Sequence, residues 1–168
     1  MKKFSLAALC ATTIIVSAGF ASSMANASPP SNWSADLLAA ANFKETVAIN
    51  SERIKFQTKG DTDTYEVRLN WAANGNSGWH HHPGIVLVQV ASGLIDVTRV
   101  VNGECKTTRY GVGSPNGSTF TEGDTMHVGT SAAGAVAYAT AVVAAGAPSR
   151  IDDSPPPCAS NFAVRKPK

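Results

Sequence analysis

All four histidines of the chain lie in two places. Three are consecutive, His80, His81 and His82, and His127 comes later in the sequence. In an extended strand, side chains two residues apart leave the same face, so His80 and His82 can bind one ion while His81 points away. With His127 as a third imidazole, the chain would offer three ligands and an open coordination position, as catalytic metal sites do. The alternative from spacing alone is a solvated loop of consecutive histidines, unrelated to His127.

The predicted cofactor is one divalent transition metal. Neutral imidazole suits iron, manganese, zinc, copper and nickel, and the spacing does not choose among them. Beyond the metal ligands, the sequence assigns no catalytic residue, because it contains neither a nucleophile elbow nor a glycine-rich phosphate loop after a strand.

Both histidine segments resemble motifs of the cupin superfamily. The first motif has a glycine, HxH, a glutamate and a second glycine, and residues 75–86 (GNSGWHHHPGIV) followed by Gly93 are similar to it. Residues 121–127 (TEGDTMH) are similar to a degenerate second motif. The chain looks most like small exported single-domain cupins with a GWHxHPG core. This resemblance implies a jelly-roll β-barrel with a metal on three histidines: His80, His82 and His127.

The chain departs from the cupin pattern at two positions. Val86 stands where the family has its glutamate ligand, and Ser131 stands where an asparagine often follows the second-motif histidine. The ligand set is then three histidines alone, or three histidines with an unusual fourth ligand. Glu122 is the nearest candidate in sequence, although a turn carboxylate in water is the favoured interpretation. Three neutral imidazoles would leave the charge of the ion uncompensated and would favour an anionic or chelating ligand.

The elements that must position these residues are predicted to be strands. Short segments of period-two alternation recur between turn residues, and 14 glycines and 9 prolines suit a turn-rich β protein. In one segment Tyr65, Val67, Leu69 and Trp71 form the expected inward set. The predicted strands are 46–50, 53–58, 64–71, 85–90, 94–101, 106–110, 119–121, 125–129 and 135–144.

A short helix is predicted before the strands, over Ala35 to Ala41, with Ser34 as its N-cap. After His82, continued alternation would turn Val86, Val88 and Val90 toward the ligands and make the barrel interior apolar. The predicted fold class is all-β: a single-domain cupin jelly-roll β-barrel with a short N-terminal helix and an extended C-terminal tail.

Residues 1–27 are predicted to be a signal peptide. Two lysines precede an uncharged apolar run (4–20), and the small residues Ala25 and Ala27 supply a cleavage site. An uncleaved membrane anchor is the alternative. The expected localisation is therefore exported, either periplasmic or secreted. The rest of the chain divides into a linker and short helix (28–45), the cupin barrel (46–145) and a proline-rich tail (146–168).

Two cysteines remain after such cleavage, Cys105 and Cys158. An even count in an exported chain favours a disulfide, which would tether the C-terminal tail to a surface loop. In the tail, Arg150, Asp152 and Asp153 are expected to form surface ion pairs of little energetic weight.

The charge balance excludes one class of partner. Of 14 Lys+Arg, Lys2 and Lys3 lie in the leader, which leaves 12 against 12 Asp+Glu. No basic stripe remains for a nucleic acid, and no membrane association is expected after cleavage. The expected partner is a small-molecule ligand or substrate, with a homodimer as the default assembly of such barrels.

The sequence therefore leaves three functions open. The first is a metal-dependent oxygenase or isomerase acting on a small chelating organic compound. The second is a non-catalytic cupin module that binds a small ligand. The third is a structural barrel without metal, because a cupin fold alone does not choose a reaction.

Overall fold

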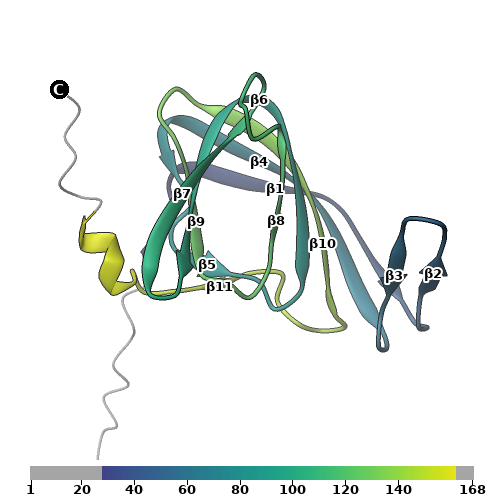
Figure 1. Cartoon of the computed structure of the whole chain (residues 1–168). Helices are drawn as coiled ribbons and strands as arrows, with labels where there is room; N and C mark the ends of the chain where they lie inside the picture. Colours follow the sequence, from purple (N-terminus) through teal and green to yellow (C-terminus); the bar gives the residue numbers. More distant parts are fainter. Residues whose placement is uncertain (1–27, 162–168) are drawn as a thin grey trace, which may run out of the picture.

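The computed structural model describes residues 28–161, which fold almost entirely into β-strands (Figure 1). The predicted signal peptide and the last residues of the predicted tail lie outside this range. Within it, no helix is both long enough and apolar enough to cross a membrane. The elements are β1 (Ser31–Phe43), β2 (Ala48–Asn50), β3 (Lys55–Gln57), β4 (Thr62–Asn76), β5 (His80–His81), β6 (Ile85–Val101), β7 (Glu104–Gly111), β8 (Thr119–Glu122), β9 (His127–Ser131), β10 (Ala135–Ala144), β11 (Ile151–Asp152) and the 3₁₀ helix η1 (Pro157–Asn161).

Four strands close the barrel. β4 pairs with β10, β10 with β6, β6 with β9, and β9 again with β4, all antiparallel. β1 extends this sheet beside β4, while β7 and β8 pair with β6. Closure leaves few unpaired strand edges, and it confirms the predicted all-β barrel.

β6 serves two sides of the barrel. Its first half pairs with β8 and β10, and its second half pairs with β7 and β9. The change occurs at Gly93, where φ is 75° and an added Cβ would overlap the carbonyl oxygen of Gly134. The two strands predicted at 85–90 and 94–101 are therefore one strand that bends at this glycine.

The barrel interior is apolar, as the alternation predicts. Val86, Val88 and Val90 are buried on β6, and Trp71 is buried on β4. The inner face of β10 carries alanines at 135, 137, 139 and 141, followed by the buried Val143. Two of these alanines, Ala139 and Ala141, line a cavity inside the barrel.

The predicted N-terminal helix is wrong. Residues 31–43 form β1, which pairs with β4 so that Ala35 lies opposite Leu69. The alanine-rich sequence favours a helix locally, but pairing with the edge of β4 satisfies the backbone along the strand. Pairing also packs Trp33 against Trp71, with their ring centroids 6.2 Å apart.

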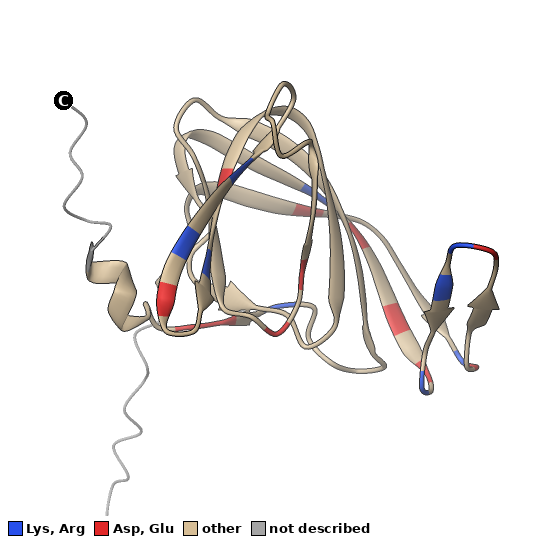
Figure 2. Ribbon diagram, in the orientation of Figure 1, with Lys and Arg blue, Asp and Glu red and all other residues tan. Residues whose placement is uncertain are grey.

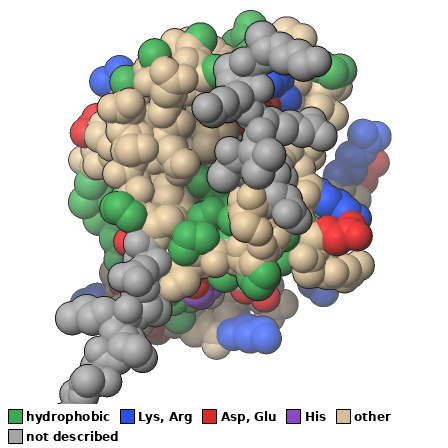
Figure 3. All heavy atoms as spheres, turned by 90° about the vertical axis from the view of Figure 1, so that its left-hand side faces the viewer, with side chains coloured by type: hydrophobic (Ala, Val, Ile, Leu, Met, Phe, Trp, Pro, Cys, Tyr) green, Lys and Arg blue, Asp and Glu red, His purple; other side chains and the backbone are tan. Residues whose placement is uncertain are grey.

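The predicted barrel boundary at residue 46 also differs from the structure. β1 belongs to the barrel sheet, whereas β2 and β3 form a separate two-stranded sheet that extends away from it (Figure 1). This hairpin and the loops beside it carry a large share of the charged residues (Figure 2). On the face shown in Figure 3, hydrophobic side chains gather near the lower centre and charged side chains lie toward the edges.

The chain after β10 returns to the barrel. β11 pairs with β5, so that Asp152 lies opposite His80 and Ile151 lies opposite His81. The disulfide between Cys105 and Cys158 is present and joins η1 to β7. Residues 146–153, which we term the return segment, are therefore attached to the barrel at both ends and are not a free extended tail.

Candidate metal centre and its cavity

Two antiparallel strands bring the histidines together. His80 on β5 is the register partner of His127 on β9, and their ring centroids are 4.3 Å apart. The His82 ring lies 5.0 Å from that of His80 and 5.2 Å from that of His127. His81 faces the other way, and its Nδ1 donates to Asp153 at 2.8 Å. The structure thus brings together the three histidines that the sequence proposes as ligands.

Glu122 joins this group from the end of β8. Its side chain is only 10% exposed, with Oε1 3.2 Å from Nε2 of His127 and Oε2 3.3 Å from Nε2 of His82. The favoured interpretation of Glu122 as a turn carboxylate in water is therefore wrong. Glu122 is the register partner of Val86, so its carboxylate enters from the strand beside the position where the cupin motif has its glutamate.

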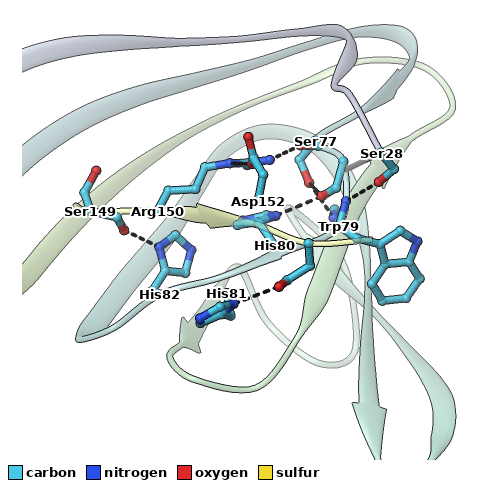
Figure 4. Close-up of polar contacts among 12 residues, drawn as sticks. Ser28, Ser77, Trp79, His80, His81, His82, Ser149, Arg150 and Asp152 are labelled. Atoms are coloured by element: carbon cyan, nitrogen blue, oxygen red, sulfur yellow. Dashed lines mark hydrogen bonds and ion pairs between the residues drawn. The ribbon is translucent and has the colours of Figure 1, made fainter. Parts of the chain in front are cut away.

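Backbone carbonyls fix the orientation of all three imidazoles. Nδ1 of His80 contacts the carbonyl oxygen of Gly78 at 2.9 Å, and Nδ1 of His127 contacts that of Thr125 at 2.7 Å. Nδ1 of His82 contacts the carbonyl oxygen of Ser149 at 2.6 Å, and Ser149 belongs to the return segment (Figure 4). A carbonyl oxygen only accepts, so each Nδ1 carries a proton, and in the neutral form of each ring the lone pair is on Nε2.

These contacts bring two imidazole nitrogens to the Glu122 carboxylate, an arrangement that either a metal ion or protons on Nε2 would stabilise. Nε2 of His82 and Nε2 of His127 are buried, and neither has a hydrogen-bond partner among residues 28–161. Each faces an oxygen of Glu122, which also accepts. Ligand atoms bound to one ion at ~2.1 Å lie about 3.0–3.4 Å apart at right-angled or tetrahedral positions. The two separations from Glu122 fall in this range, and the ligand atoms of all four residues lie within 4.8 Å of one another.

Electrostatics favour the protonation states that a metal requires. Burial, with the nearby charges of His127 and Arg150, lowers the pKa of His80 to about 2, so this imidazole is neutral. Burial alone would raise the pKa of Glu122, but N–H donation from His127 and His82 in the metal-free protein outweighs it and lowers that pKa below its ordinary value. His80 therefore offers a neutral nitrogen and Glu122 an ionised carboxylate.

A cavity of about 90 Å³ lies beside this group inside the barrel. His80, His82 and Glu122 form one side of it. Its walls are otherwise mainly apolar and include Val67, Leu69, Val86, Ile95, Phe120, Ala139 and Ala141. Two further residues line it from outside the motif segments, Trp33 on β1 and Arg150 on the return segment.

The opposite side of the ligand group borders an open pocket. His82, Glu122 and His127 line that pocket together with Arg99 and Asp124. The four ligand residues thus separate an apolar interior cavity from a polar pocket at the surface. An ion can reach the group from the polar side, while the cavity side is suited to an organic ligand.

Comparison with known proteins assigns neither a family nor an activity to this chain. No family model and no curated protein matches the sequence. Solved structures similar to it include a recombinant oxalate oxidase in complex with glycolate (17% identity, TM-score 0.39, 48% of this chain and 45% of that chain). Others are an oxalate decarboxylase variant from Bacillus subtilis (15%, 0.45, 75% and 37%) and vicilin from Capsicum annuum (13%, 0.42, 53% and 24%).

This chain spans less than two thirds of each of those three proteins. The scores are too low to assign it a relative's activity. Its own closed sheet and the placement of its two histidine motifs define the architecture. The fold is a cupin-like barrel. Within this cupin-like barrel, sequence reasoning missed the interior positions of Trp33 and Arg150, because it assigned Trp33 to a linker and Arg150 to surface ion pairs.

Proposed function

We propose that this protein is an exported metal-binding cupin that holds one divalent transition metal with His80, His82, Glu122 and His127. One observation carries the proposal: three imidazole nitrogens and an ionised carboxylate converge within 4.8 Å of one another, with the carboxylate oxygens 3.2 and 3.3 Å from two of the nitrogens. Without a metal ion, His82 and His127 must either leave a buried Nε2 lone pair facing the Glu122 carboxylate, at a cost of about 1–3 kcal/mol each, or carry a second proton in a buried site. This cost argues against a structural barrel without metal.

The chemistry that we propose is that of a metal-dependent oxygenase or isomerase acting on a small chelating organic compound. Such an ion supplies Lewis acidity and, if it is redox-active, electron transfer to the bound compound. The chain holds the four ligands in fixed orientations through carbonyl bonds to Nδ1. Its apolar cavity would exclude water around the bound compound.

A non-catalytic module that binds a small ligand is the second candidate. The small volume of the cavity, about 90 Å³, supports it because a compact ligand could be enclosed there without turnover. A binder would show ligand-dependent thermal stabilisation that follows mass action, with no product formed. An oxygenase would consume oxygen only with both metal and substrate present.

Export is part of the same proposal. The disulfide between Cys105 and Cys158 supports it, because such bonds persist in oxidising compartments. N-terminal sequencing of the protein recovered outside the cytoplasm tests it directly. A mature chain that begins at Ser28 is expected, whereas an intact residue 1 would contradict cleavage.

Elemental analysis of untagged protein tests the metal site. We expect about one metal ion per chain in the wild type and almost none in a His80→Ala/His82→Ala double variant. His81→Ala is the matched control, because His81 lies between the two ligands and faces away from them. Iron, manganese, copper or nickel would favour oxygenase chemistry, and zinc would favour an isomerase. A wild-type protein that binds none of these ions, even after reloading, would refute the proposal.

A further inference from the structure

We propose that Arg150 and Trp33 form a second anchoring point in the cavity, and that the ligand they select is a small organic carboxylate. This inference rests on the proposed metal site, which borders the same cavity and would supply positive charge to it. Neither residue belongs to the histidine motifs. Trp33 comes from β1 and Arg150 from the return segment, and both line the cavity that His80, His82 and Glu122 border.

Arg150 is held at the edge of this cavity. Its Nε donates to Asp152 Oδ1 at 2.6 Å, and one terminal nitrogen donates to the Ser77 carbonyl at 2.6 Å (Figure 4). The guanidinium also lies 5.1 Å from the centre of the Trp33 ring. These contacts fix the side chain, which is 20% exposed, before any ligand arrives. A fixed guanidinium loses less conformational entropy on binding a carboxylate than a free one does.

Donors remain available on both side chains. A guanidinium has five N–H groups, and the two bonds of Arg150 use only two of them. The indole Nε1 of Trp33 is buried, with no acceptor among the described residues. Buried indole N–H groups normally have a partner. A carboxylate has enough acceptor sites to receive bonds from a guanidinium and from a second donor.

The charge around the cavity selects an anion. A divalent ion next to the single carboxylate of Glu122 keeps one uncompensated positive charge. The charge of Arg150 is balanced by Asp152, which is 51% exposed and therefore screened by water. A monoanion would neutralise the site, whereas a neutral compound would leave the positive charge in an apolar cavity.

The walls limit the size and polarity of that anion. Most of the other side chains that line the cavity are apolar, Val67, Leu69, Ala139 and Ala141 among them. A volume of about 90 Å³ corresponds to roughly three water molecules in the liquid. A compact aliphatic carboxylate fits these conditions, because its hydrocarbon part would contact the walls and its oxygens would meet the donors.

Calorimetric titration of manganese-loaded protein with propionate and with propionamide tests the inference. The two probes have nearly the same shape and differ in charge. We expect propionate to bind at least about tenfold more tightly, since hydrogen bonds to charged groups contribute about 1.5–3 kcal/mol. Arg150→Met and Trp33→Phe should each reduce this preference severalfold without changing the metal content. Arg68→Met, which removes an exposed arginine of β4, is the matched control.

The outcomes separate this inference from the proposed function. A wild-type protein that takes up no metal refutes the proposed function. A metal-loaded wild type that binds propionate and propionamide equally overturns the ligand class while the metal site stands. Unchanged preference in both variants overturns the roles of Arg150 and Trp33. Thermal melting checks folding, and Trp33→Phe retains an aromatic ring, so the test does not depend on Arg150→Met alone.

Discussion

The Glu122 carboxylate reaches the histidines from β8, the strand beside Val86. Val86 is the position at which the cupin motif has its glutamate and this chain has valine. Directly paired residues of antiparallel strands present their side chains on the same face, with Cβ atoms about 4.5–5.5 Å apart. Val86 and Glu122 are such a pair. The site can therefore keep a carboxylate although the motif residue is apolar.

Glu122→Gln should weaken metal binding at least about tenfold, because the amide keeps the size of the side chain but removes its charge. Competition with a chromogenic chelator measures the affinity. Glu104→Gln is the control, since the Glu104 side chain is 74% exposed. Equal affinities for the wild type and Glu122→Gln would show that the carboxylate is not a ligand.

A swap tests the register argument itself. Glu122→Val should lose most of the metal affinity, and adding Val86→Glu to it should recover part of the loss, because the carboxylate returns to the same inner face. The same chelator competition measures both variants. No recovery in a folded double variant would contradict the equivalence of the two positions.

Protonation of His80 makes the stability of the metal-free protein depend on pH. The ordinary pKa of histidine is 6.5, and in the folded protein the pKa of His80 is about 2. Below pH 6.5 the unfolded chain therefore binds a proton that the folded chain does not. The free energy of unfolding must fall as the pH falls from about 6.5 toward 2.

At pH 5 this residue should reduce the free energy of unfolding by about 2 kcal/mol relative to its value at neutral pH. Urea denaturation of chelator-treated protein at the two pH values measures the difference. His80→Gln should have a smaller difference, because its side chain does not titrate. The same pH dependence in wild type and variant would contradict the assignment to His80.

At the scale of the elements, the sequence predicts which side chains of a strand face inward, but it does not predict which strands pair with one another. The alternation of Tyr65, Val67, Leu69 and Trp71 depends on side-chain direction alone, and the structure buries this face wholly or partly. The helix expected over 35–41 failed because alanine-rich sequence also fits a strand once an edge partner is present. Glu122 was misjudged for a related reason, since its burial follows from the register of β8 against β6.

The position of the return segment against the barrel could not be predicted from the sequence either. Arg150 lies in a proline-rich region without periodicity, so its expected place in surface ion pairs could not be tested against a strand or helix pattern. Its interior position follows from the pairing of β11 with β5 and from contacts to Ser77 and Trp33. Such contacts join residues far apart in sequence, which local patterns do not encode.

Close packing at the start of β6 should be sensitive to one methyl group. A Cβ added at Gly84 would overlap the carbonyl oxygen of Val142 and would lie 2.9 Å from Cγ1 of Val143. Gly84→Ala should therefore destabilise the protein by about 1–3 kcal/mol. Gly60→Ala is the matched control, because nothing lies within 4 Å of its added Cβ. Similar denaturant midpoints for both variants would contradict the close approach.

At the scale of the whole molecule, the disulfide holds the return segment against the barrel. The bond joins residues separated by 53 positions, and it stabilises the fold by about 4 kcal/mol in the chain-entropy model. The return segment supplies the carbonyl of Ser149 that orients His82. Loss of the disulfide should therefore affect both stability and metal binding.

A Cys105→Ser/Cys158→Ser variant should have a lower melting temperature and a metal affinity reduced by about tenfold. Differential scanning calorimetry and chelator competition measure the two effects. Reduction of the wild type with a phosphine should reproduce both. A variant that melts earlier but binds metal with unchanged affinity would show that the return segment orients His82 without the disulfide.

The carbonyl of Ser149 also sets an order of events during maturation. His80 and His82 are close neighbours in the chain, whereas His127 and Ser149 follow much later. A partly synthesised or partly folded chain would thus present two imidazoles without the groups that complete and orient them. Tight capture of the ion has to wait until the barrel is closed and the return segment is in place. The protein would therefore acquire its metal in the compartment where it finishes folding, and the supply of ions there would decide which metal it carries.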